Sequence, residues 1–285
     1  MTNAPDLFDA DLLARRRARA ERLGGADFLH AAVAGEVSER LGEINRTFRA
    51  PAVVGPRATL WAETLAGGGL PVPLAVADGE LLALEEGAHD LVVHGLALHW
   101  ANDPVGQLVQ ARRALVPDGL FIAALFGGET LVELRAALAE AEVATLGGLS
   151  PRVAPMGEIR DLGGLLQRAG FALPVADSRR FDVSYPDAVA LMRDLRAMGE
   201  TNVMRDRLRR PLRRETLAQA AAVYAERFGL PGGRVRASFD VIFLTGWAPA
   251  AGQPRPLRPG SAVSRLADAL GTVERSAGEP TGGGG

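Results

Sequence analysis

Apolar and polar positions alternate along the chain in blocks typical of an α/β protein. Residues 90–94 and 120–125 are two apolar runs, and the first of them ends at a polar position. Between them, Asn102-Asp103-Pro104 is expected to begin a helix, because Asp can cap free amides and Pro suits the first turn. Apolar residues then recur at helical spacing as far as Leu115. This order predicts a right-handed parallel βαβ unit, whose ligands would bind beyond the carboxyl ends of its strands.

Further helices and strands are expected on both sides of this unit. Two leading helices are predicted at Leu7–Leu23 and Phe28–Phe48. The arginine run Arg15–Arg17 in the first is interpreted as a solvated face, with a partner-binding arm as the alternative. The other predicted elements, in chain order, are a strand at Ala50–Val54, a helix near Arg57–Leu65, a strand at Leu74–Asp78, helices at Gly128–Thr145 and Pro155–Ala169, short strands at Phe171–Val175 and Arg180–Val183, a helix after Ser184-Tyr-Pro186, a helix at Thr216–Phe228 and a last strand at Ala237–Trp247.

Composition and charge exclude several classes of function. The chain has 285 residues, of which 47% are hydrophobic, so it can bury a full core. Its formal charge of −2 does not indicate the excess of basic residues that is typical of nucleic-acid-binding proteins. Without cysteine it has no disulfide, thiolate metal site or cysteine nucleophile. No apolar run is long enough for a membrane span, and the acidic N-terminus is unlike a signal peptide, so we expect a bacterial cytoplasmic protein, with peripheral attachment to the inner membrane as a variant.

Several motifs resemble a known family. They are Asp90-Leu-Val-Val, Leu98-His-Trp-Ala-Asn-Asp103, Pro117-Asp-Gly and Phe126-Gly-Gly-Glu-Thr-Leu-x-Glu-Leu134, which are similar to the second half of a class I S-adenosylmethionine (SAM) methyltransferase domain. More narrowly, the similarity from Leu7 to Trp247 resembles the mitochondrial respiratory complex I assembly factor 5 family and its bacterial relatives. An animal member of that family is described as an arginine hydroxylase that acts on a complex I subunit. The resemblance therefore implies a Rossmann-type sheet, SAM as cofactor and a protein substrate, with a respiratory complex I subunit as the expected partner.

The resemblance also predicts how the chain is divided. Residues 1–48 are expected to form N-terminal helices, which in methyltransferase-like proteins cover the open side of the cofactor. Residues 49–249 would form the methyltransferase-like domain, with a helical substrate-side insertion at 184–230. Residues 250–285 are rich in Gly, Pro, Ala and Arg, and we expect them to be disordered apart from a short helix at Ser261–Leu270.

The expected SAM site departs from the family pattern. The usual site has an acid at the end of the first strand and then G-x-G-x-G, whose glycines let the backbone approach the methionine moiety. This chain reads Val54-Gly55-Pro56-Arg57-Ala58-Thr59, which keeps only the first glycine. From Ala50 to Glu80 there are 31 residues, enough for one βαβ unit but not two, so the strand whose acid binds the ribose is expected to be missing.

The remaining cofactor positions follow from the same resemblance. Asp78 is expected to meet the adenine amino group, with an ordinary turn residue before a glycine as the alternative. The positions expected nearest SAM are Gly55, Asp78, Leu96, His99 and Trp100. Because these losses accumulate, we expect SAM to bind weakly.

Candidate catalytic and substrate residues lie at the strand ends and in one later loop. His99, Asp103 and Glu200 are the catalytic candidates. An iron site of His94, His99 and Asp103 is disfavoured against histidines held by hydrogen bonds, and we predict no metal. A carboxylate such as Glu200 could hold an arginine substrate with two hydrogen bonds. The expected substrate-side residues are Phe126, Gly127, Gly128, Glu129, Glu200 and Asn202, although the glycines also suit a strand-to-helix turn without a ligand.

Three hypotheses for function remain open at this stage. The first is an enzyme of the assembly factor 5 type that modifies a protein arginine or transfers a methyl group from SAM. The second is a non-catalytic assembly or chaperone factor with the same fold. The third is a small-molecule or acyl-carrier O-methyltransferase, which would need an intact SAM site. Whether SAM occupies the site would distinguish these hypotheses.

Overall fold

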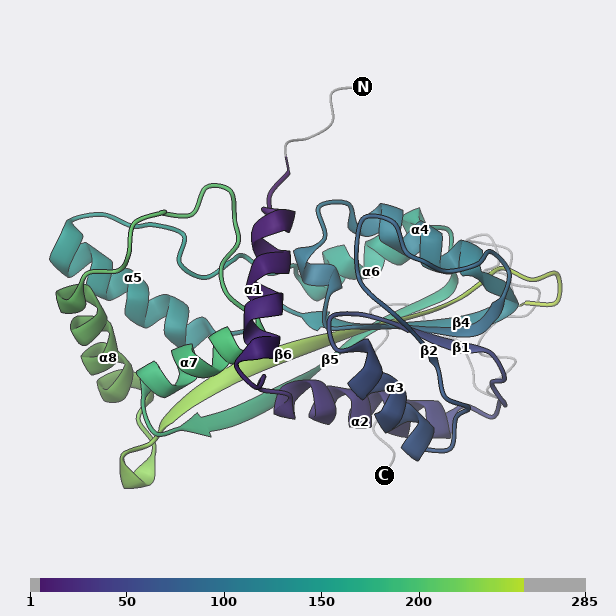
Figure 1. The fold of residues 1–285 in the computed structure, drawn as a ribbon, viewed down its shortest axis with the longest axis horizontal. Helices are drawn as coiled ribbons and strands as arrows, with labels where there is room; N and C mark the ends of the chain where they lie inside the picture. The colour runs from purple at the N-terminus through teal and green to yellow at the C-terminus, as the bar shows by residue number, and fades with distance from the viewer. Residues whose placement is uncertain (1–5, 254–285) are drawn as a thin grey trace, which may run out of the picture. The chain divides into compact units, whose positions relative to one another are not determined.

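A six-stranded mixed sheet organises the computed structural model, which describes residues 6–253 (Figure 1). The strands are β1 (Pro51–Val54), β2 (Leu74–Val76), β3 (His89–Gly95), β4 (Leu115–Phe126), β5 (Ala172–Tyr185) and β6 (Val235–Trp247). The helices are α1 (Ala10–Arg22), α2 (Phe28–Glu43), α3 (Ala58–Gly67), α4 (Pro104–Ala114), α5 (Val132–Leu146), α6 (Ile159–Arg168), α7 (Ala188–Met198) and α8 (Arg214–Phe228), with 3-10 turns at Leu98–Trp100 and Pro231–Gly233. The described residues up to Ala250 form one compact unit. The predicted tail helix at Ser261–Leu270 lies outside the described residues.

The strand order is β2-β1-β3-β4-β6-β5. The first four strands are parallel, and β6 runs antiparallel to both β4 and β5. The predicted βαβ unit is confirmed as β3-α4-β4, in which Leu91 pairs with Leu120. The side chain of Asp103 accepts a hydrogen bond from the backbone N–H of Gly106 at 2.8 Å, and Pro104 is the first residue of α4. The α/β sheet is therefore the Rossmann-type architecture that the sequence predicts.

Two apolar cores lie on opposite faces of the sheet. Because side chains alternate along a strand, Leu91 and Val93 face the core that contains α2, α3, α5, α7 and α8. Val92 and Phe121 face the smaller core under α4 and α6. Figure 1 shows α4 and α6 on one side of the strands and α2 and α3 on the other.

The first half of the sheet is shortened as expected. One helix, α3, separates β1 from β2, and β2 has only three residues. β2 pairs directly with β1, from Ala52 opposite Leu74 to Val54 opposite Val76. No further strand separates β2 from β1, so Asp78, which follows β2, lies near the Gly55 turn.

The edge strand β5 differs from the prediction. Phe171–Val175 and Arg180–Val183 were expected to be separate short strands, but one strand runs through Ala172–Tyr185 and pairs with β6 from Val175 opposite Thr245 to Tyr185 opposite Val235. The polar residues between the two expected strands stay in the ladder, because at a sheet edge their side chains can point to solvent while their backbone pairs with β6.

Candidate functional site

A buried carboxylate, Glu200, follows α7 and faces the carboxyl end of β3. Its Oε2 accepts a hydrogen bond from Trp100 Nε1 at 2.7 Å and lies 3.1 Å from His99 Nε2. The side chains of His99 and Glu200 are only 2% and 6% exposed. Burial alone would raise the pKa of Glu200, but His99, Arg17 and Trp100 together hold the pKa of that carboxyl below its usual range. The site therefore keeps an ionised carboxylate in a dry environment.

Helix α1 closes over this carboxylate. Arg17 Nη1 contacts Asp78 Oδ2 at 2.5 Å, and both side chains are largely buried. A Cβ placed on Gly199, next to Glu200, would lie 3.0 Å from Arg17 Cγ, so α1 packs directly on the glycine that ends α7. Nearer the start of the chain, the ring of Phe8 meets that of Trp100 edge to face with centroids 5.1 Å apart. The leading helix thus supplies one wall of the site.

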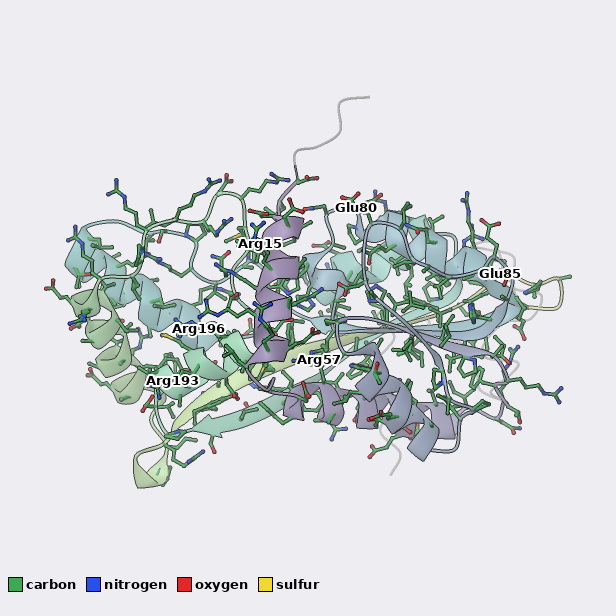
Figure 2. All side chains as sticks on the ribbon, viewed as in Figure 1. Arg15, Arg57, Glu80, Glu85, Arg193 and Arg196 are labelled. Atoms are coloured by element: carbon green, nitrogen blue, oxygen red, sulfur yellow. The ribbon has the colours of Figure 1, made fainter. Side chains whose placement is uncertain are left out.

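A second ion pair occupies the turn after β1. Arg57 stands where the family pattern has a glycine, and its Nε lies 2.9 Å from Asp27 Oδ1 between α1 and α2. Only 15% of the Arg57 side chain is exposed. Gly55 in the same turn has a structural role, because a Cβ there would lie 2.5 Å from the carbonyl oxygen of Gly95. Arg57 therefore ties the turn after β1 to the segment between α1 and α2 (Figure 2).

Buried polar atoms without a partner gather in the same region. Among the described residues, no hydrogen-bond partner exists for His94 Nδ1, His99 Nδ1, Glu200 Oε1, or for Nε and Nη2 of Arg17. Buried polar groups are normally hydrogen-bonded, so this cluster has unused capacity for a ligand or water. His94 itself is fully buried, and its Nε2 lies 3.0 Å from Gln107 Oε1. Burial lowers the pKa of His94 to about 4, so the imidazole is neutral at pH 7.

The carboxyl end of β3 is packed closely against Trp61 of α3. A Cβ on Gly95 would lie 2.6 Å from the ring of Trp61, which is fully buried and donates a hydrogen bond from Nε1 to His30 Nδ1 at 3.1 Å. The next residue, Leu96, is also fully buried and has a φ of 49°. Leu96 therefore has no exposed surface to offer a cofactor.

The Phe126-Gly-Gly-Glu-Thr130 segment forms a turn between β4 and α5. The ring of Phe126 contacts that of His99 with centroids 4.7 Å apart. A Cβ on Gly127 would lie 2.6 Å from the side chain of Ile242, and one on Gly128 would lie 2.4 Å from Glu158 Oε1. Glu129 is exposed. Close packing against Ile242 thus explains Gly127, whereas the atoms nearest Gly128 belong to the end of the exposed Glu158 side chain, which can move. Phe126 lies beside His99, the partner of Glu200.

A cavity of about 470 Å³ opens between α1, α5, α7 and the loop around Thr201; we call it the α1–α7 cavity. Its lining includes Trp100, Phe126, Glu200 and Asn202, but neither Gly55 nor Asp78. Arg16 forms part of the wall, with Nη1 donating to Thr201 Oγ1 at 2.7 Å and to the Asn202 carbonyl at 2.8 Å.

Asn202 holds this loop in place. Its Nδ2 donates to the carbonyl of Pro151 at 2.6 Å, and its Oδ1 accepts from the backbone N–H of Met204 at 2.9 Å. The cavity therefore lies beside this ordered loop, and its lining does not include the Gly55 turn.

The structure brings some predicted site residues together and separates others. His99, Trp100, Phe126, Glu200 and Asn202 lie around one site. Asp103 is exposed, and its side chain caps α4 by accepting from the backbone N–H of Gly106. Across residues 6–253, no cluster of three or more His, Asp or Glu side chains could hold a metal ion, so His94, His99 and Asp103 do not form a triad. Within the same range, no helix is long and apolar enough to cross a membrane.

Comparisons with known proteins place this geometry in a family. Residues 54–123 match the family model described as a methyltransferase domain. A curated protein of Danio rerio, "Arginine-hydroxylase NDUFAF5, mitochondrial", is 35% identical over 287 residues, which cover 92% of this chain and 89% of the relative. The chain belongs to the NDUFAF5 family. The predicted class I methyltransferase-like fold and the predicted resemblance are both confirmed.

Other relatives match over shorter regions. The human NDUFAF5 protein is 43% identical over 194 residues, covering 68% of this chain and 56% of the relative, so the chain spans about half the length of that protein. A malonyl-[acyl-carrier protein] O-methyltransferase of Laribacter hongkongensis is 38% identical over 187 residues, covering 66% of this chain and 60% of the relative. NDUFAF5 membership thus rests on the longer zebrafish match.

Sequence reasoning missed the role of the leading arginines in this NDUFAF5 protein. The run Arg15–Arg17 was interpreted as a solvated face, but only Arg15 is exposed, whereas Arg16 and Arg17 are half-buried and bind the loop and Asp78. A helical wheel could have given the signal, because Arg16 and Arg17 lie on the side of α1 that also carries the buried Leu13 and Ala20.

Proposed function

We propose that this NDUFAF5 family member acts on a protein client in the assembly of respiratory complex I and does so without a tightly bound SAM. The observation that carries the proposal is that both cofactor-facing positions are engaged by the leading helices. Asp78 is paired with Arg17 at 2.5 Å, and Arg57 in the turn after β1 is paired with Asp27 at 2.9 Å. These residues do not fit SAM, since its adenine end would compete with the largely buried Arg17–Asp78 pair and Arg57 stands where the family pattern has a glycine.

The family name of the relatives supports a protein client. The zebrafish relative is named an arginine hydroxylase and NDUFAF5, and it matches along 92% of this chain.

Titration calorimetry of the intact protein with SAM, and with S-adenosylhomocysteine in parallel, tests the cofactor part. Loss of the ribose acid removes charge-assisted hydrogen bonds worth about 1.5–3 kcal/mol, which is roughly a tenfold to hundredfold loss of affinity before any steric cost. We therefore expect dissociation constants in the high micromolar to millimolar range. Micromolar binding of either ligand would contradict the proposal and make methyl transfer from SAM the preferred function.

Deletion of the gene in its native host tests the client part. We expect less assembled complex I, measured on native gels, with unchanged transcription of the subunit genes. A plasmid copy of the wild-type gene should restore assembly, and so should Arg193→Gln, which changes an exposed residue of α7 outside the cavity. Normal complex I in the deletion strain would remove the reason for assigning this client.

Arginine hydroxylation is the second candidate, and Glu200 favours it. Its Oε1 is buried without a partner among the described residues, while Oε2 is held by His99 and Trp100. A guanidinium could donate to that free oxygen, because carboxylates pair strongly with arginine. Mass spectrometry of complex I subunits from the deletion and wild-type strains separates the candidates, since only the enzyme would leave an oxygen atom on an arginine. The O-methyltransferase hypothesis needs SAM and is disfavoured by the same two ion pairs.

A further inference from the structure

The α1–α7 cavity carries an excess of positive charge. Four arginines contribute to its lining, Arg16, Arg19, Arg152 and Arg196, against one carboxylate, that of Glu200. Arg152 is paired with Glu142 at 2.7 Å, which leaves Arg16, Arg19 and Arg196 as the source of the excess charge. Glu200 Oε2 is held by His99 and Trp100. The whole chain has a net charge of −2, so this concentration of arginine is a local feature.

These arginines repel one another. Burial, together with the nearby charges of Arg207 and Arg196, lowers the pKa of the Arg16 guanidinium from its ordinary value. The Nη1 donor of Arg16 goes to a hydroxyl and a carbonyl, neither of which carries a full negative charge. Arg19 and Arg196 are exposed, and neither forms an ion pair with another residue in the range 6–253. An anion in the cavity would relieve this repulsion.

Below the arginines the cavity is apolar. Its floor is formed by Phe126, Leu134, Leu138 and Phe239, all of which are buried. Met156 and Met192 add flexible side walls. A volume of about 470 Å³ is within the range of small-molecule sites that bury most of their ligand. The cavity thus combines an apolar interior with a cationic entrance.

We propose that the α1–α7 cavity binds a single-chain anionic amphiphile, with its acyl chain on the apolar floor and its carboxylate or phosphate head between Arg19 and Arg196. Figure 2 shows Arg196 on α7 next to α1, which carries Arg19. The guanidinium group binds both head groups through paired N–H donors. Arg16, Arg19 and Arg196 would repel a guanidinium group at this entrance. The inference is independent of the state of the cofactor site.

Direct titration of the intact protein with decanoate, decyl phosphate and decanol tests the proposal. The three probes share one chain and differ in the head group, so the neutral alcohol measures the apolar contribution alone. Trp100 lines the cavity, and its fluorescence reports occupancy alongside calorimetry. We expect both anions to bind more tightly than decanol, and their affinity to fall as salt is added, because salt screens exposed charges. The relative affinities of decanoate and decyl phosphate identify the preferred head group.

Charge-removing variants locate the head group. Arg19→Gln and Arg196→Gln change exposed residues, and each is expected to weaken decanoate binding by about three- to tenfold with no change for decanol. Arg193→Gln is the matched control, since it removes an equal charge from the same helix outside the cavity, and it should leave every affinity unchanged. Thermal melts confirm that all three variants are folded.

Three outcomes overturn the proposal. The first is equal binding of decanol and decanoate, which would remove the role of the arginines. The second is an equal effect of Arg193→Gln and Arg196→Gln, which would indicate a diffuse surface potential. The third is absence of decanoate and decyl phosphate binding, together with binding of an acidic apolar decapeptide, which would assign the cavity to a peptide.

Discussion

Lowering the pH from 8 to 5 is expected to reduce the free energy of unfolding by about 4 kcal/mol through His30 and His94 together. Both imidazoles are buried, and burial lowers the pKa of each to about 4. In the unfolded chain a histidine has its ordinary value of 6.5. Between these values the unfolded state binds the proton and the folded state does not, so stability falls as the pH drops below about 6.5. Above that pH the two histidines contribute no pH dependence.

Two conservative variants test this expectation. His30→Asn keeps an acceptor for Trp61 Nε1, and His94→Gln keeps a donor for Gln107 Oε1. Each should remove about 2 kcal/mol of the change between pH 8 and pH 5, whatever its stability at pH 8. Urea unfolding followed by fluorescence at a series of pH values gives these free energies. If both variants keep the wild-type slope, the histidines accept protons in the folded state and the interpretation of their burial is wrong.

Glu200→Ala is expected to lower the free energy of unfolding by about 3 kcal/mol at pH 7. The substitution leaves two buried donors, on His99 and Trp100, without their acceptor. It also removes a negative charge that faces Arg17. Glu200→Gln should cost less, because the amide oxygen can still accept from Trp100. Urea unfolding at pH 7 measures all three proteins.

A matched substitution on the surface provides the control for Glu200. Glu39→Ala removes an exposed carboxylate of α2 and should change stability by no more than about 0.5 kcal/mol. A similar small effect of Glu200→Ala would show that the carboxylate is solvated, and the buried site described above would be wrong. A large effect of Glu200→Ala and a small one of Glu200→Gln would assign most of the stability to the hydrogen bond.

The elements that could be predicted were those whose burial leaves a periodic pattern. Residues 90–94 and 120–125 are apolar because they pair in the centre of the sheet, and the Asp103-Pro104 start of α4 has its own local chemistry. Edge strand β5 was predicted as two separate strands, because the residues in its middle are polar. Its side chains alternate between half-buried and exposed, so it has no continuous apolar pattern. The strand order depends on contacts between distant segments, and nothing local in Leu74–Val76 shows that it pairs with β1.

The site was predictable only where its residues belong to a motif. His99, Trp100 and Glu200 lie in segments that resemble the family, and the structure brings these three together. The ion pair between Arg17 and Asp78 joins residues 61 apart in a helix and a loop, so no spacing rule could reveal it. Whether Asp78 is free for a cofactor or held by a neighbour is decided by tertiary packing.

The contacts of α1 set the order in which the site can be assembled during synthesis. Arg16 bonds to Thr201, 185 positions later in the chain, and the backbone N–H of Asp9 bonds to the carbonyl of Val203. At the usual translation rate of about 5–20 residues per second, α1 leaves the ribosome roughly 10–40 s before its partners exist. During that interval its apolar side, which carries Leu13, lacks Val203 and Met204, two members of the cluster that buries it. Closure of the site is therefore a late folding event, slowed by the long loop that must close first.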